Sequence, residues 1–199
     1  MLYGLLCGDG SLTSYEAAAR QGKWRIDFAE SDPEVVVEYA RLTKEVFGVS
    51  PSVRNRKRWH EAYYCSKVVY RFYSRVLGHR TGKKTGSLRI PESFRHDPRL
   101  LFGFLRGLFT AEASIKVERN IRIALEMQEP LLMKQTASIL KDATFHPHLY
   151  SYAKNGRHVY GLYIYGLDET RLFHRRIGFV GRKRLRLSKV ISQFERRGL

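Results

Sequence analysis

The pattern of hydrophobic and polar positions changes its period repeatedly along the chain, and each change marks a predicted element. Apolar residues spaced by three and four, with proline near the start and glycine near the end, are typical of helices. Alternation at every second residue is typical of strands. The predicted helices are residues 2–10, 31–48, 68–78, 105–113, 130–142 and 168–178. The predicted strands are residues 11–20, 23–30, 51–59, 61–67, 114–119, 120–128, 146–153 and 158–166.

The order of these elements is the same in both halves of the chain: helix, two strands, helix, two strands, helix. The first helix of each half carries a related motif, because LYGLLCGDG at residues 2–10 aligns with LRGLFTAEA at residues 105–113. A linker rich in glycine and basic residues, 78–99, joins the halves. We therefore predict a duplicated α+β fold, with one half over residues 1–98, linker included, and the other over residues 99–199.

Each motif contains two small residues four positions apart, which lie on one face of a helix and allow another backbone to approach closely. These helix-interface residues are Gly4, Gly8, Gly107 and Ala111. If the helices pack face to face in a parallel sense, the acids that follow, Asp9 and Glu112, meet at the helix C-terminal ends. Their mutual repulsion and the partial negative charge of both helix ends favour a bound cation. Oxygen ligands suit Mg²⁺, which can assist phosphodiester hydrolysis.

The charge of the chain indicates a polyanionic partner. Lys and Arg number 36 against 19 Asp and Glu, which gives a formal net charge of +17, and nucleic acid is the leading candidate. We expect no membrane partner and no secretion signal, because the chain lacks a long apolar run and reaches an acid soon after its start. Cys7 and Cys65 are the two cysteines. They give no disulfide framework and suggest a reducing, intracellular compartment.

The paired motifs resemble those of LAGLIDADG homing endonucleases in the single-chain form, and the likeness in element order covers essentially the whole chain. This resemblance implies an αββαββα unit repeated about a pseudo-two-fold axis, with two antiparallel sheets forming a saddle over DNA. It also implies a staggered cut in double-stranded DNA. We predict a monomer that cuts a long asymmetric target, because the two halves differ in their strand-face residues. The implied cofactor is Mg²⁺, for which Mn²⁺ can substitute, held by Asp9, Glu112 and the main-chain carbonyls of Gly8 and Ala111.

Both motifs depart from the family pattern in ways that affect the site. The closing glycine of the second motif is replaced by Ala113, which predicts that this residue is not in a left-handed conformation. Cys7 and Thr110 stand where a further acid could be, so one acid per helix remains. The resemblance suggests Gln128 as a residue that positions water. The candidate supporting cations are Lys84, Lys116 and Lys183.

Alternation along the strands predicts which side chains face DNA, because successive residues point to opposite faces of a sheet. Basic and polar side chains on the open faces would contact base edges and phosphates. The candidate DNA-binding residues are Lys23, Arg25, Asp27, Arg54, Arg56, Arg58, Lys84, Arg122, His146, His148, Tyr150 and Tyr163. We predict one shared strand face for the three arginines at 54, 56 and 58, and one row containing both histidines.

Two other functions remain open from the sequence. The same scaffold is used by maturases, which would bind intron RNA, and a DNA-binding regulator could use it without cutting. A single motif could also be an ordinary helix end that reverses the chain. Acids at both motif ends, Asp9 and Glu112, favour a nuclease over these alternatives.

Overall fold

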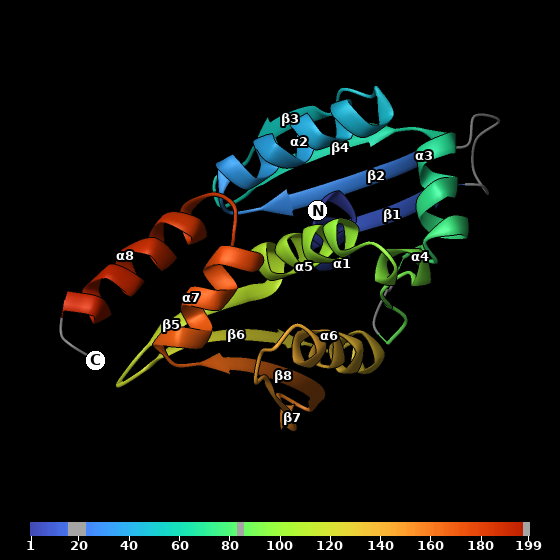
Figure 1. Cartoon of the computed structure of the whole chain (residues 1–199). Helices are drawn as coiled ribbons and strands as arrows, with labels where there is room; N and C mark the ends of the chain where they lie inside the picture. The colour runs from blue at the N-terminus through green and yellow to red at the C-terminus, as the bar shows by residue number, and fades with distance from the viewer. Residues whose placement is uncertain (16–22, 83–85, 197–199) are drawn as a thin grey trace.

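The structure, a computed structural model, describes residues 1–15, 23–82 and 86–196. Two series of elements follow one another along this chain (Figure 1). The first consists of α1 (Leu2–Asp9), β1 (Gly10–Tyr15), β2 (Lys23–Glu30), α2 (Pro33–Phe47), β3 (Ser52–Asn55), β4 (His60–Cys65), α3 (Lys67–Arg71) and a π-helical turn (Phe72–Val76). The second consists of α5 (Pro98–Glu112), β5 (Ala113–Val117), β6 (Ile121–Met127), α6 (Pro130–Asp142), β7 (His148–Lys154), β8 (Arg157–Tyr165) and α7 (Leu167–Arg176).

Each series forms one four-stranded antiparallel sheet, and the two sheets have matching strand orders, β1-β2-β4-β3 and β5-β6-β8-β7. Helices α2 and α3 pack on the first sheet, and α6 and α7 pack on the second. The helix pair α1 and α5 lies between the sheets (Figure 1). The fold is therefore the predicted α+β arrangement of two antiparallel sheets around a central helix pair.

The central helices are held by burial and by capping. Residues Leu2–Gly8 of α1 are all buried, as expected for a helix that is apolar on every side. Helix α5 begins at Pro98, and its N-cap Asp97 accepts a hydrogen bond from the backbone N–H of Arg99 at 2.8 Å. Both helices contribute to a single core cluster that continues into both sheets. One core therefore fixes the two halves relative to each other.

Two helices lie where the sequence analysis placed none. A short helix, α4 (Glu92–Arg95), interrupts the linker, and a longer one, α8 (Arg182–Arg196), follows the last predicted element. Leu187, Val190 and Ile191 form much of the buried side of α8. The predicted strand over residues 51–59 is also too long, because β3 ends at Asn55.

The part of the linker from Gly86 to Ile90 is held at α6 by side-chain hydrogen bonds. Glu129 is only 4% exposed, and its two carboxylate oxygens accept hydrogen bonds from the backbone N–H groups of Gly86 at 2.7 Å and Leu88 at 2.9 Å. Gln135 accepts a third from Ile90 at 2.9 Å. These bonds tie the segment between the two series to the C-terminal sheet layer. None of the helices in the described ranges combines the length and apolar character needed to cross a bilayer.

Candidate active site and DNA-binding surface

Helices α1 and α5 approach so closely that side chains would not fit between them. A Cβ added to Gly4 would lie 2.0 Å from the carbonyl oxygen of Phe104, and one added to Gly107 would lie 2.1 Å from that of Met1. A Cβ on Gly8 would lie 2.4 Å from the Cβ of Ala111. The structure thus brings all four predicted interface positions together. Gly4 lies against Phe104 of α5, and Gly8 lies against Ala111, which is nearer the C-terminal end of α5. The two helices therefore run parallel, and their C-terminal ends lie together.

Asp9 and Glu112 are the last residues of these two helices. The Glu112 side chain lies against the end of α1, since a Cβ on Gly8 would be 3.0 Å from its Cγ and 3.5 Å from its Oε1. The pKa of Asp9 is raised to about 7, first by loss of solvation against the packed helix ends and then by the negative charge of Glu112. Glu30, at the end of β2, adds further negative charge and a hydrogen bond to Asp9. The structure therefore brings both predicted acids into one negative centre.

A partly buried lysine faces this centre from the C-terminal segment. The Nζ atom of Lys183 donates hydrogen bonds to the carbonyl oxygens of Thr110 at 2.6 Å and Ala111 at 3.1 Å. Burial lowers the pKa of Lys183, whereas the charges of Glu30, Asp9, Glu112 and Asp32 act in the opposite direction. Of the two predicted lysines that the structure describes, Lys183 is therefore the one beside the acids.

The position of Lys183 depends on both halves of the chain. The residue before it, Arg182, donates its backbone N–H to Asp32 Oδ2 at 2.6 Å, and Asp32 also caps α2 through the N–H of Glu34 at 3.1 Å. The backbone N–H of Val180 donates to Thr110 Oγ1 at 3.1 Å. The start of α8 is thus attached to the N-terminal half through Asp32 and to the end of α5 through Thr110.

The donors at this centre fit a small, hard cation. Two carboxylates and nearby carbonyl groups are oxygen ligands of the kind that Mg²⁺ prefers, and Mg²⁺ usually keeps several waters. Burial and the negative charge of Glu112 both raise the pKa of Asp9, and a cation would relieve the repulsion between the two carboxylates. Within the described ranges, no group of three or more His, Cys, Asp or Glu side chains is arranged to hold a metal.

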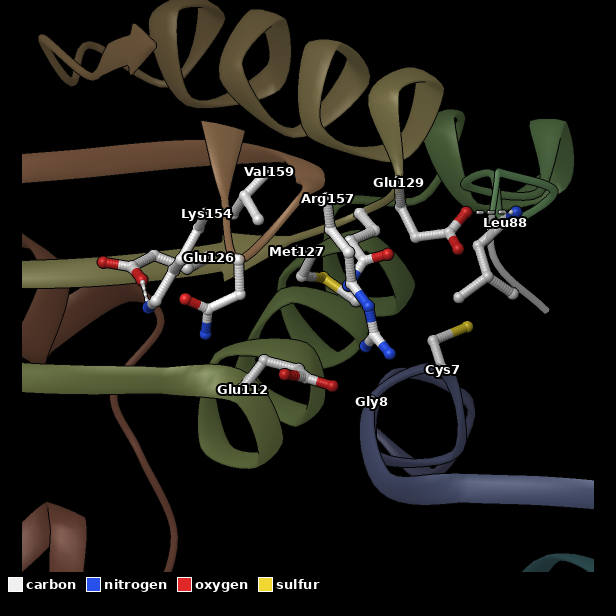
Figure 2. A pocket seen from close by; sticks show the side chains of 12 residues that line it. Cys7, Gly8, Leu88, Glu112, Glu126, Met127, Glu129, Lys154, Arg157 and Val159 are labelled. Carbon is white, nitrogen blue, oxygen red and sulfur yellow. Dashed lines mark hydrogen bonds and ion pairs between the residues drawn. The ribbon is translucent and has the colours of Figure 1, made fainter. Parts of the chain in front are cut away.

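A cavity of about 660 Å³ opens beside the ends of α1 and α5 (Figure 2). Its lining includes Glu112, Gln128 and Glu126, together with two basic residues, Lys154 and Arg157. The side chain of Arg157 extends toward the helix ends in Figure 2. The predicted Gln128 therefore shares a cavity with Glu112, while Arg157 was not among the predicted site residues.

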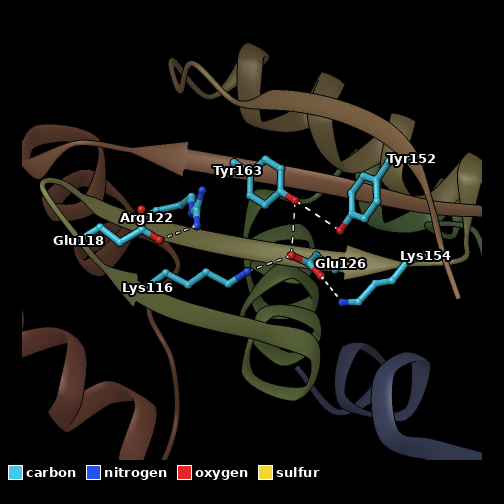
Figure 3. Close-up of polar contacts among 7 residues, drawn as sticks. All are labelled: Lys116, Glu118, Arg122, Glu126, Tyr152, Lys154 and Tyr163. Carbon is cyan, nitrogen blue, oxygen red and sulfur yellow. Dashed lines mark hydrogen bonds and ion pairs between the residues drawn. The ribbon is translucent and has the colours of Figure 1, made fainter.

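Lys116 has different partners from Lys183. Lys116 is directed to the sheet, where its Nζ donates to Glu126 Oε1 at 3.1 Å (Figure 3). Lys84 lies outside the described residues, and so does the side chain of Lys23 at the start of β2. Ala113 has φ −83°, which confirms the predicted absence of a left-handed conformation.

The open face of the first sheet carries a compact group of charged residues. The Arg25 Nε donates to Asp27 Oδ1 at 2.6 Å, and its guanidinium also donates to Glu61 Oε1 at 3.0 Å. Tyr63 lies between two cations, with the guanidinium carbons of Arg25 and Arg54 at 4.5 Å and 4.2 Å from its ring centroid. These contacts hold several predicted DNA-binding side chains in fixed positions.

The predicted common strand face for three arginines is wrong for two of them. Arg56 and Arg58 lie beyond the end of β3, because the chain turns there and the backbone N–H of Arg56 donates to the carbonyl of Trp59 at 2.9 Å. His146 is likewise not in the histidine row. It precedes β7, and its ring Nδ1 lies 2.9 Å from Glu169 Oε1.

The open face of the second sheet is largely aromatic. His148 stacks on Tyr150 with ring centroids 6.3 Å apart, and Tyr150 contacts Tyr163 at 5.8 Å. The Arg122 guanidinium carbon lies 5.5 Å from the Tyr163 ring centroid. The two sheets thus present different chemistry on corresponding faces, charged in the first half and more aromatic in the second.

Comparison with known proteins identifies the second series most directly. The sequence profile of the LAGLIDADG-like domain matches residues 99–178. A curated protein from Methanocaldococcus jannaschii, the isomerizing glutamine–fructose-6-phosphate aminotransferase, is 26% identical over 205 residues. That match covers 98% of this chain but only 17% of the length of the aminotransferase.

Solved structures of homing endonucleases match nearly the whole chain. Mesophilic variants of the homing endonuclease I-DmoI give a TM-score of 0.68 at 17% identity, covering 88% of this chain and 87% of theirs. I-DmoI in complex with DNA and Mn gives 0.66 at 17% identity, covering 88% and 93%. The meganuclease I-SmaMI bound to DNA gives 0.60 at 11% identity, covering 93% and 86%. Residues 99–178 therefore match the LAGLIDADG-like domain, and the chain as a whole has the fold of the single-chain LAGLIDADG homing endonucleases.

Proposed function

We propose that this protein is a site-specific DNA endonuclease that makes a staggered double-strand cut in a long asymmetric target by metal-dependent hydrolysis. One observation carries the proposal: two parallel helices, one from each half, end together and place Asp9 and Glu112 at a shared negative centre. The net charge of +17 supports double-stranded DNA as the partner. The different open faces of the two sheets support an asymmetric target.

We assign residues 1–98 to one DNA half-site and residues 99–199 to the other, in a monomer that contains both. Asp9, Glu112 and the carbonyls of Gly8 and Ala111 would hold Mg²⁺, with Mn²⁺ as a substitute. When bound, the metal neutralises charge on the scissile phosphate and lowers the pKa of an attacking water.

The remaining residues of the centre have supporting roles. The ammonium group of Lys183 stabilises the closely placed acids before DNA binds, and it adds positive charge where the phosphate must approach. The amide of Gln128 can hold water in the cavity that it shares with Glu112. Glu30, through its hydrogen bond to Asp9, can orient that carboxylate.

A cleavage screen tests this proposal. The purified protein is incubated with Mg²⁺ and a plasmid pool that carries random inserts, and the cut ends are sequenced. We expect cuts at one preferred sequence, with the same overhang in every cut molecule. Asp9→Asn and Glu112→Gln should retain DNA binding and lose the cutting of at least one strand. Glu45→Gln is the matched control, because Glu45 is an exposed acid on α2 that pairs with Arg41.

Each contrary result identifies a different function. Full double-strand cutting by both acid variants would refute the site assignment. Sequence-specific binding without cutting by the unmodified protein would indicate a DNA-binding regulator. Preferential retention of structured intron RNA in competition with duplex DNA would indicate a maturase.

A further inference from the structure

The open faces of the two sheets are related position by position. Tyr63 of β4 pairs with Asp27 on one side and Ser52 on the other. Tyr163 of β8 pairs in the same way with Ala124 and His148. The two tyrosines therefore occupy equivalent positions in the two sheets. Each has a guanidinium over its ring, Arg25 in the first half and Arg122 in the second.

Two residues before each tyrosine, the cross-strand pair contains one acid in both sheets. The acid lies on β4 in the first sheet and on β6, the neighbour of β8, in the second. In the first sheet Ala29 of β2 pairs with Glu61 of β4. In the second sheet Glu126 of β6 pairs with Gly161 of β8. The same cross-strand position thus holds one carboxylate in each half, while its partner is small.

The glycine at 161 determines how the second sheet is arranged. A Cβ added to Gly161 would lie 2.5 Å from the Oη of Tyr163 and 2.7 Å from its Cζ. The ring therefore lies over the glycine, and its hydroxyl reaches Glu126 Oε1 at 3.4 Å and the hydroxyl of Tyr152 at 3.5 Å (Figure 3). Tyr63 cannot lie in this way, because Glu61 occupies the corresponding position.

Glu126 is held in place as an ionised carboxylate that accepts hydrogen bonds from its neighbours. Lys116 donates to its Oε1 at 3.1 Å and Lys154 donates to its Oε2 at 3.2 Å. Partial burial would raise the pKa of Glu126, but hydrogen bonds from Lys116, Lys154 and Tyr152 lower it to about 2. The side chain remains 22% exposed and lines the cavity next to Glu112. A carboxylate has about four lone-pair sites, so it can still accept from a ligand.

We propose that Glu126 and Lys154 together read one C·G base pair in the target half bound by the second sheet. This proposal rests on the proposed DNA-binding function. In the major groove, cytosine presents its N4 amino donor beside the O6 and N7 acceptors of guanine. A fixed carboxylate next to an ammonium that is 58% exposed has the complementary pattern of acceptor and donor. Because both line the cavity beside Glu112, the base pair read is close to the point of cutting.

Binding selection from a random duplex pool, sequenced after several rounds, tests this inference independently of cutting. The preferred site is then resynthesised with each of the four base pairs at every position, and dissociation constants are measured. We expect the unmodified protein to prefer C·G by about tenfold at one position near the centre of its site. Glu126→Gln should reduce this preference to about threefold or less and leave the other positions unchanged.

Two further variants separate base reading from a structural role. Glu118→Gln is the matched control, because Glu118 lies in the turn between β5 and β6, is 72% exposed and pairs with Arg122. It should leave the base profile unchanged. Gly161→Ala should displace the Tyr163 ring and weaken the preference at the same position as Glu126→Gln. An unchanged profile for Glu126→Gln, or a uniform loss at all positions, overturns the inference. Specific binding without cutting would refute the proposed hydrolysis and leave this base contact standing.

Discussion

Replacing Gly4 by alanine is the sharpest test of the helix contact on which the active site depends. The added Cβ would lie 2.0 Å from the carbonyl oxygen of Phe104 and 2.7 Å from the backbone nitrogen of Leu108. Ordinary contact begins at 3.4 Å, so the helices would have to separate by about 1.4 Å (3.4 − 2.0). Both opposing atoms belong to the backbone of α5 and cannot rotate away.

The sign of the stability change distinguishes close packing from ordinary helix propensity. In an isolated helix, Gly→Ala stabilises by about 1 kcal/mol. Overpacking a well-packed core costs about 1–3 kcal/mol or more, and a clash against backbone belongs at the upper end. We therefore expect Gly4→Ala to lose about 2 kcal/mol net. For a chain of 199 residues this corresponds to about 4–8 °C in Tm.

Urea and thermal unfolding followed by circular dichroism measure this loss, and DNA cutting is assayed on the same preparations. Cutting should fall more steeply than binding, because separated helices hold Asp9 and Glu112 further apart. Gly103→Ala is the control: it makes the same change within α5, but its Cβ would lie 3.1 Å from the nearest atom, the Met1 nitrogen. A Gly4→Ala protein as stable as the unmodified chain would refute the inferred helix contact.

Three further predictions concern charge. The pKa of Asp9 is raised from 3.8 to about 7, so the metal-free folded protein retains a proton that the unfolded chain loses. The free energy of unfolding should therefore decrease as the pH rises from about 4 to about 7. Urea titrations in the presence of a chelator measure this slope, which should be smaller in Asp9→Asn. Glu129→Ala leaves the N–H groups of Gly86 and Leu88 unpaired and should lower the free energy of unfolding by about 3 kcal/mol. Limited proteolysis near residue 86 should become faster, and a variant that resists the protease would contradict the role of Glu129 in holding this segment. DNA affinity should fall steeply and linearly in log salt; fluorescence anisotropy showing a flat response would argue against phosphate contacts.

Much of the candidate site could be predicted from local sequence because the motif occurs twice, and each copy supports the interpretation of the other. The small residues and acids of the two motifs occur at one spacing, 103 positions apart (112 − 9). Each motif alone is weak evidence, but the equal spacing of the small residues predicts one parallel register for the two helices. In that register Asp9 and Glu112 meet at the helix ends, so their proximity could be predicted from the sequence. Strand periodicity likewise identified Arg25, Asp27 and Tyr163 on open faces.

Other parts of the site have no local signal. Lys183 lies on a helix that the repeat does not contain, and its position depends on Asp32, 151 positions earlier in the chain (183 − 32). Glu30 reaches Asp9 only because β2 ends beside α1. Arg56, Arg58 and His146 alternate correctly with their neighbours, but turns and strand ends remove them from the faces to which the alternation assigned them.

By itself, the sequence determined the duplication, the α+β class, the order of the repeated elements, the paired acids and the positive charge, since each depends on residue type and spacing along one segment. The tertiary structure decided where strands stop, which lysine faces the acids, and how Glu126 is held among Lys116, Lys154 and Tyr163. Those contacts join residues far apart in the chain. Their existence depends on strand pairing and helix packing, which no short window of sequence specifies.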